Sequence, residues 1–152
     1  MKKILLLLTC VIAYGSSIAQ CMKPVDLNSR TANSDLIVEG KVTAKHSFWN
    51  AAHNMIYTAN TVEIYKVFKG NATSTSIEIM TTGGTVGLDR ITAEPSLSLK
   101  AGDIGIFTGE TVKRYNLAGT NLSSLPKYEA YASSQGFIRY DLNAETAADP
   151  FF

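Results

Sequence analysis

The chain of 152 residues has a globular composition and almost no net charge, and together these properties exclude several classes of protein. Hydrophobic residues make up 45% of the sequence and charged residues 18%, a balance that intrinsically disordered chains do not have. The formal net charge is only +1, whereas binding to nucleic acid requires a basic excess. We therefore expect no nucleic-acid partner.

Residues 1–19 have the pattern of a cleaved export signal. Lys2 and Lys3 precede an apolar run over residues 4–13, and small residues follow as far as Ala19. This run is shorter than the roughly 20 apolar residues that a membrane-spanning helix needs. We therefore predict a signal peptide rather than a transmembrane segment, and a mature protein that is secreted or held at the cell surface.

Cys21 is the only cysteine that remains after this cleavage, because Cys10 lies within the predicted signal peptide. Bacterial lipoproteins are cleaved directly before a cysteine that is then acylated, so Cys21 is a candidate lipidation site. The residue before it is Gln20, where that cleavage favours a small residue. Simple cleavage near Ala19 is the favoured interpretation, and lipidation of Cys21 stays open beside it.

The rest of the sequence predicts β-strands and no long helix. Residues 20–34 are polar and predict an extended arm, residues 35–142 a β-barrel domain, and residues 143–152 a tail that resembles the start of a further segment. Within the domain, apolar residues alternate rather than recur with helical spacing. The fold class is therefore all-β, a barrel or a sandwich. Strands are expected over residues 36–45, 55–69, 76–81, 91–93, 104–108, 112–117 and 137–142.

The alternation also predicts which side chains form the core and where the strands bend. Gly40 lies inside the first strand and indicates a bulge, and the change of phase over residues 62–67 indicates a second one. The glycines of residues 83–87 predict a corner with positive φ or close backbone approach. The expected core is Leu36, Val38, Val42, Val62, Ile64, Val67, Ile77, Ile79, Ile104, Ile106, Phe107, Phe137 and Ile138.

His46, Trp49 and His53 lie close together in the predicted connection over residues 46–54. Imidazoles bind zinc and indoles stack on sugars, so His46 and His53 are weak candidate metal ligands and Trp49 is a candidate ligand-binding aromatic. A zinc site needs three or four ligands, and no nearby cysteine or carboxylate completes this one. A solvated loop with one anchoring tryptophan is the favoured interpretation.

No motif for catalysis or cofactor binding is present. The glycines of residues 83–87 lack the Lys-Ser/Thr pair and the helix of a phosphate-binding loop. The sequence also lacks the Gly-x-Ser-x-Gly and His-Glu-x-x-His patterns of common hydrolases. We therefore expect no cofactor and no enzymatic activity from this chain, although a longer protein that contained it could be an enzyme.

Four segments carry a family resemblance. They are Ser34-Asp35-Leu36-Ile37-Val38-Glu39-Gly40-Lys41-Val42, Ile64-Tyr65-Lys66-Val67-Phe68-Lys69-Gly70, Gly83-Gly84-Thr85-Val86-Gly87 and Gly102-Asp103-Ile104-Gly105-Ile106-Phe107. In these the chain resembles an N-terminal OB-like β module of large secreted flavobacterial (Bacteroidetes) proteins, some of which also carry a metalloprotease domain. The resemblance implies a fold, a closed or partly open barrel of the OB-like type, since its motifs are turn and core residues.

The chain also resembles, more faintly, the netrin-like domain of tissue inhibitors of metalloproteinases. The shared features are a cysteine near the mature N-terminus, the strand over residues 33–38 and the element over residues 67–70. In those inhibitors the N-terminal cysteine chelates the zinc of the protease. Here Met22 and Lys23 follow Cys21 in place of a Cys-x-Cys start, and the disulfides of the family are missing.

The sequence thus predicts a secreted, non-catalytic β-barrel module with a scaffold or binding role, as the N-terminal part of a larger extracellular protein. Its expected partner is an extracellular protein or polysaccharide. The first alternative is an accessory or inhibitor-like domain of a secreted metalloprotease. The second is a small surface lipoprotein anchored at Cys21.

Overall fold

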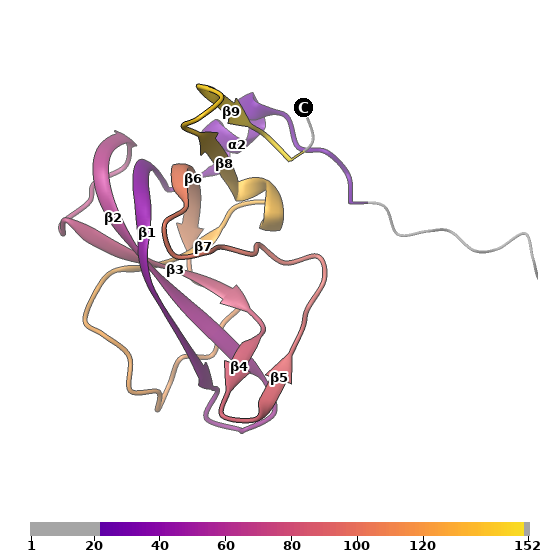
Figure 1. Ribbon diagram of the computed structural model, residues 1–152. Helices are drawn as coiled ribbons and strands as arrows, with labels where there is room; N and C mark the ends of the chain where they lie inside the picture. Colours follow the sequence, from indigo (N-terminus) through magenta and orange to yellow (C-terminus); the bar gives the residue numbers. More distant parts are fainter. Residues whose placement is uncertain (1–21, 151–152) are drawn as a thin grey trace, which may run out of the picture.

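The computed structural model describes residues 22–150, and these form an all-β fold with one short α-helix (Figure 1). The predicted all-β class is confirmed. The elements are helix α2 (Leu27–Asn33), strands β1 (Leu36–Trp49), β2 (Ile56–Lys69), β3 (Ser76–Thr82), β4 (Gly84–Val86), β5 (Asp89–Ile91), β6 (Ile104–Thr111) and β7 (Lys127–Ala130), the 3-10 helix η1 (Ser133–Gly136), and strands β8 (Phe137–Asp141) and β9 (Thr146–Ala148).

Five of the strands close into a ring. Strand β1 pairs with β2, β2 with β3, β3 with β7, β7 with β6, and β6 returns to β1. The β3–β7 pair is parallel and the other four pairs are antiparallel. Strands β8 and β9 extend the sheet from β6 and lie near α2 at one end of the ring, while the β4–β5 hairpin lies at the opposite end (Figure 1).

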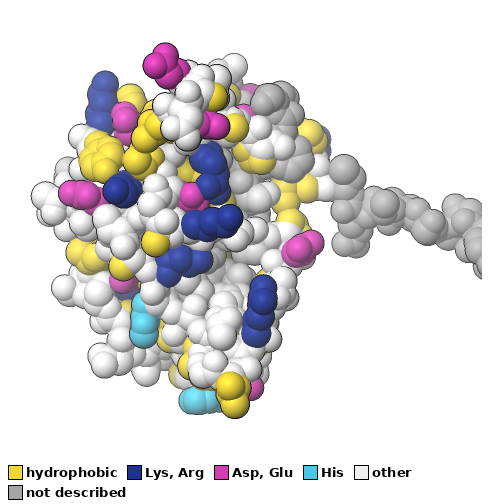
Figure 2. Space-filling model, viewed as in Figure 1, with side chains coloured by type: hydrophobic (Ala, Val, Ile, Leu, Met, Phe, Trp, Pro, Cys, Tyr) yellow, Lys and Arg dark blue, Asp and Glu magenta, His cyan; other side chains and the backbone are white. Residues whose placement is uncertain are grey.

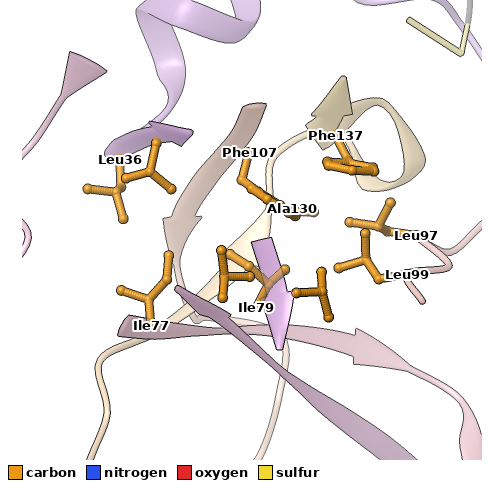
Figure 3. Packing of buried hydrophobic residues seen from close by; sticks show 11 residues of the cluster. Leu36, Ile77, Ile79, Leu97, Leu99, Phe107, Ala130 and Phe137 are labelled. Atoms are coloured by element: carbon orange, nitrogen blue, oxygen red, sulfur yellow. The ribbon is translucent and has the colours of Figure 1, made fainter. Parts of the chain in front are cut away.

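The core fills the inside of this ring (Figure 3). Eight of the thirteen expected core residues are buried: Leu36, Val38, Val42, Val62, Ile77, Ile79, Phe107 and Phe137. Ile64, Ile104, Ile106 and Ile138 are only partly buried. Leu97 and Leu99, from the loop after β5, close one side of the core and were not expected there.

Val67 is the core prediction that is wrong, and β-bulges explain why. Val38 of β1 pairs with Val67 of β2. The pairing passes over two residues of β2, Tyr65 and Phe68, and each of them forms a bulge. Each extra residue bends the strand and changes which side chains face inward. The end of β2 is consequently uncovered, and Val67 is 40% exposed. The predicted change of phase and the bulge at Gly40 are both confirmed by the register shifts.

The arm predicted for residues 20–34 is corrected over its second half, where α2 forms. Asp26 caps this helix, because its carboxylate accepts hydrogen bonds from the Ser29 amide at 2.9 Å and the Ser29 hydroxyl at 2.7 Å. With 7 residues, the helix is too short to show an apolar period. Its stability comes from the cap and from packing, which the alternation pattern does not reveal.

Several further boundaries differ from the expectation. The strand expected over residues 91–93 lies instead at β5 (Asp89–Ile91), and β4 and β7 were not expected. Strand β1 continues to Trp49, so the predicted connection over residues 46–54 shrinks to a turn over residues 50–55. Residues 112–117 form no strand. Thr111 pairs with Tyr128 at the end of β6, and after this pair the chain leaves the ring as a loop. Strand β9 lies in the predicted tail and pairs with β8.

Candidate ligand-binding site

A row of aromatic rings covers one surface at the hairpin end of the molecule. Phe48 of β1 faces Tyr57 of β2 across the strand pair, and the two rings meet edge to face with centroids 6.2 Å apart. His46 stacks on Phe48 at 6.1 Å, and Tyr115 meets Tyr57 edge to face at 4.9 Å. We call these four residues the aromatic row. Three separate segments build it, and its members are only partly buried or exposed.

Tyr115 joins the row through the loop over residues 112–126. Thr82, the last residue of β3, donates a hydrogen bond from its hydroxyl to the Tyr115 hydroxyl at 3.4 Å. Burial raises the pKa of Tyr115 above its ordinary value of 10.0. The phenol therefore stays protonated at neutral pH and keeps a proton to donate. The sequence predicts a strand over residues 112–117 and does not indicate this contact, because the contact depends on a long loop folding back.

The structure separates the three residues that the sequence grouped together. Trp49 is the last residue of β1, and its indole stacks on the His53 ring at 5.7 Å rather than on His46. His53 sits in the turn over residues 50–55 at φ 51°. Asn50 holds this turn by accepting a hydrogen bond from the Asn54 amide at 3.1 Å. Each histidine thus contacts a different aromatic ring.

A polar pocket of about 320 Å³ lies between the β1–β2 strands, the β4–β5 hairpin and the loop that follows β5, on the face of β1 and β2 opposite to Phe48 and Tyr57. Thr58 forms part of its wall and is 4% exposed. Its hydroxyl donates to the Gly83 carbonyl at 2.7 Å and lies 2.8 Å from the Ser47 hydroxyl. Most other polar wall residues also carry hydroxyl groups: Thr81, Thr82, Thr85, Thr92, Ser96 and Ser98.

Gly84 makes this pocket sterically feasible. Its φ is +147°, and a Cβ added there would lie 2.5 Å from both the Ser47 and the Thr58 hydroxyl oxygens. Only a residue without a side chain lets the hairpin approach β1 and β2 so closely. Gly83 and Gly87 also have positive φ, at +93° and +60°. The prediction of a structural glycine corner over residues 83–87 is confirmed.

Two cationic side chains and one carboxylate line the same pocket. The Lys45 ammonium donates to the Leu99 carbonyl at 2.5 Å, and Arg90 of β5 and Glu94 are exposed. Neither Lys45 nor Arg90 has an ion pair with a carboxylate of residues 22–150. The pocket therefore offers hydroxyl groups together with charges that the protein does not neutralise.

Within residues 22–150, no group of three or more histidine, cysteine or acidic side chains is placed to hold a metal ion. No helix in that part of the chain is both long and apolar enough to cross a membrane. The predicted signal peptide over residues 1–19 and the candidate lipidation site Cys21 lie outside the described residues. Predictions about them stay predictions.

Fold and site together define an all-β barrel that carries an aromatic surface and, on the opposite face of β1 and β2, a polar, partly cationic pocket. Comparison with protein-family models, with curated proteins and with solved structures gave no match. The geometry of the chain itself is therefore the basis for assigning a function.

Proposed function

We propose that the chain is an exported, non-catalytic binding module built on an OB-type barrel. An OB-type barrel is a five-stranded Greek-key barrel. The ring of β1, β2, β3, β7 and β6 supports this assignment, because its last two strands in sequence are exchanged in space and one pair is parallel. The signal-like pattern of residues 1–19 supports export.

The aromatic row occupies the surface with which such barrels bind ligands. OB-type barrels use the face of their second and third strands and the loops after their first and fourth strands. The equivalent parts here are β2, β3, the turn over residues 50–55 and the loop over residues 112–126. Tyr57, Thr82 and Tyr115 come from these parts and contact one another.

The aromatic row is the observation that carries the proposal, and it favours a polysaccharide as ligand. A pyranose ring presents a flat C–H face that packs on an aromatic ring, while its hydroxyl groups need polar partners at the edge. Phe48 and Tyr57 supply rings on a sheet surface, and the Tyr115 and Thr82 hydroxyls supply polar groups beside them. A protein ligand is the competing outcome of the test below.

The test is retardation of the purified protein in native gels that contain xylan, β-glucan or polygalacturonate. We expect at least one polysaccharide to retard the protein, and Phe48→Ala to weaken that retardation about tenfold or more, as for a buried aromatic anchor. The single tryptophan, Trp49, adds a fluorescence readout close to the site.

Tyr65→Ala is the matched control. Tyr65 lies on the same strand, outside the aromatic row, and is 52% exposed. Its loss should leave retardation unchanged. The proposal fails if no gel retards the protein, or if Phe48→Ala and Tyr65→Ala have equal effects.

The first alternative is an accessory or inhibitor-like domain of a secreted metalloprotease, and the second is a lipoprotein. The inhibitor-like role and the lipoprotein depend on Cys21, which lies outside the described part of the chain, whereas the accessory role does not. Both alternatives stay predictions.

A further inference from the structure

We infer that the polar pocket beside the β4–β5 hairpin binds an acidic sugar unit, with Arg90 pairing the carboxylate of a uronate. This inference rests on the proposed function, because it takes the ligand to be a polysaccharide. It goes further by assigning a second contact site and a chemical class of sugar.

The pairing of the arginines is the first argument. The chain has four arginines, and three of them pair with carboxylates of the same chain: Arg30 with Asp149, Arg114 with Glu129, and Arg139 with Asp103. Of the arginines within residues 22–150, Arg90 is the one for which the structure shows neither an ion pair nor a side-chain hydrogen bond, and it lies at the pocket. A guanidinium group matches a carboxylate through two parallel hydrogen bonds, so an external carboxylate is its natural partner.

The composition of the pocket wall is the second argument. At about 320 Å³ the pocket is at the small end of ligand sites, and its wall is richer in hydroxyl groups than such sites usually are. Four of these hydroxyl groups already have partners within the chain, those of Thr58, Thr81, Thr82 and Ser96. An apolar ligand would cover the exposed Thr85, Thr92 and Ser98 hydroxyls without offering them a partner, at a cost in free energy. A sugar ring can pair with them, and the Glu94 carboxylate at the rim can accept hydrogen bonds from sugar hydroxyls.

The position of the pocket is the third argument. Thr82 lines the pocket, and its hydroxyl also contacts Tyr115 of the aromatic row. The row and the pocket lie on opposite faces of the β1–β2 pair and are linked through Thr82, so a chain that engages both passes around the end of β3. In Figure 2, Lys and Arg side chains follow one another down one face of the barrel toward the hairpin end. A face with this charge attracts a polyanion.

The test is calorimetric titration of the purified protein with galacturonate oligosaccharides and with their methyl esters. Esterification removes the charge and keeps the sugar ring. We expect the acid form to bind about tenfold tighter or more, as for a charge-assisted pair. Arg90→Gln should bind both forms equally, and Arg90→Lys should recover part of the preference, since it keeps the charge without the fork.

Lys23→Gln is the matched control, because it removes one exposed positive charge in the N-terminal arm, away from the pocket and from the aromatic row. It should keep the preference for the acid form. If the wild type binds both forms equally, or if Arg90→Gln keeps the preference, the acidic-sugar inference is overturned while the polysaccharide function stands. If the protein binds neither form and no polysaccharide in the gels, both fall.

Discussion

The two ends of the barrel use charged side chains in opposite ways. At the end with α2, β8 and β9, Arg30 is 1% exposed, donates to the Gln135 carbonyl at 2.7 Å and pairs with Asp149. At the hairpin end, Lys45 and Arg90 are exposed and meet no carboxylate of the described residues. A buried charge must be paired to be tolerated, whereas an exposed unpaired one costs little and is available to a ligand. The paired charges at the first end stabilise the fold, whereas the unpaired charges at the hairpin end are available to bind a ligand.

The first end also fastens the N-terminal segment. The Gln135 amide oxygen accepts a hydrogen bond from the Val25 amide at 2.7 Å, and its nitrogen donates to the Lys23 carbonyl at 3.1 Å. Gln135 is itself 1% exposed. One side chain therefore satisfies two backbone groups of the arm, as a neighbouring strand would. Arg30 and Gln135 together join α2, the arm and η1 into one unit (Figure 1).

The largest expected effect comes from breaking this unit. Arg30→Ala leaves the Gln135 carbonyl and the Asp149 carboxylate without their buried arginine, and we expect a loss of about 3–5 kcal/mol in the free energy of unfolding. Urea denaturation measures this loss. Lys113→Ala is the control, since the Lys113 side chain is 69% exposed and its partner Glu110 is 21% exposed, and its loss should cost at most about 1 kcal/mol. Equal losses for the two variants would contradict the contrast.

A smaller effect is expected at the hairpin end. Gly84→Ala places a methyl group against the Ser47 and Thr58 hydroxyls, and we expect a loss of about 1–3 kcal/mol together with a distorted pocket. Gly87→Ala is the matched control, because φ there is +60° but no atom lies within 4 Å of an added Cβ. It should cost about 1–2 kcal/mol from backbone strain alone, with no loss of ligand binding. Binding that survives Gly84→Ala would show that the hairpin does not shape the site.

The sequence revealed the parts of the fold that depend on local alternation. The positions of β1, β2, β3, β6 and β8 follow from their apolar period of two, and the corner at residues 83–87 follows from its glycines. Helix α2 and strand β9 were missed, because the first is held by a cap and a buried arginine and the second by pairing with β8. Helix α2 depends on Gln135 and Asp149, which are distant in the sequence, whereas β9 forms a hairpin with the adjacent β8 just beyond the predicted end of the domain.

The candidate site was predictable only in part, for the same reason. Trp49 and His46 were noticed as residue types that bind ligands, but their grouping with His53 assumed a loop where β1 continues. Tyr115 reaches the aromatic row because a 15-residue connection, residues 112–126, folds back over β2 and β3. Nothing in the local pattern around Arg90 shows that it lacks a partner, since pairing depends on which carboxylates the fold brings near.

The smallest expected effect sharpens the contrast through pH. The Asp35 carboxylate accepts hydrogen bonds from the Thr111 amide at 2.7 Å and the Thr111 hydroxyl at 2.9 Å, and these lower the pKa of Asp35 below its ordinary value of 3.8. A carboxylate with a lower pKa in the folded state stabilises the fold above its unfolded pKa, and this stability is lost as the pH falls through the folded pKa. Asp35→Asn should therefore be less stable than wild type at pH 7, by less than about 1 kcal/mol because the group is exposed.

Urea denaturation of both proteins at pH 7, 5 and 2.5 measures that difference, which should be constant between pH 7 and 5 and shrink at pH 2.5. Arg90→Gln gives the comparison at the other end. Since Arg90 contacts no carboxylate of the described chain, its loss should change the free energy of unfolding by less than about 0.5 kcal/mol at every pH. A larger, pH-dependent loss in Arg90→Gln would mean that the arginine pairs within the protein, and it would remove the reason to assign it to a ligand.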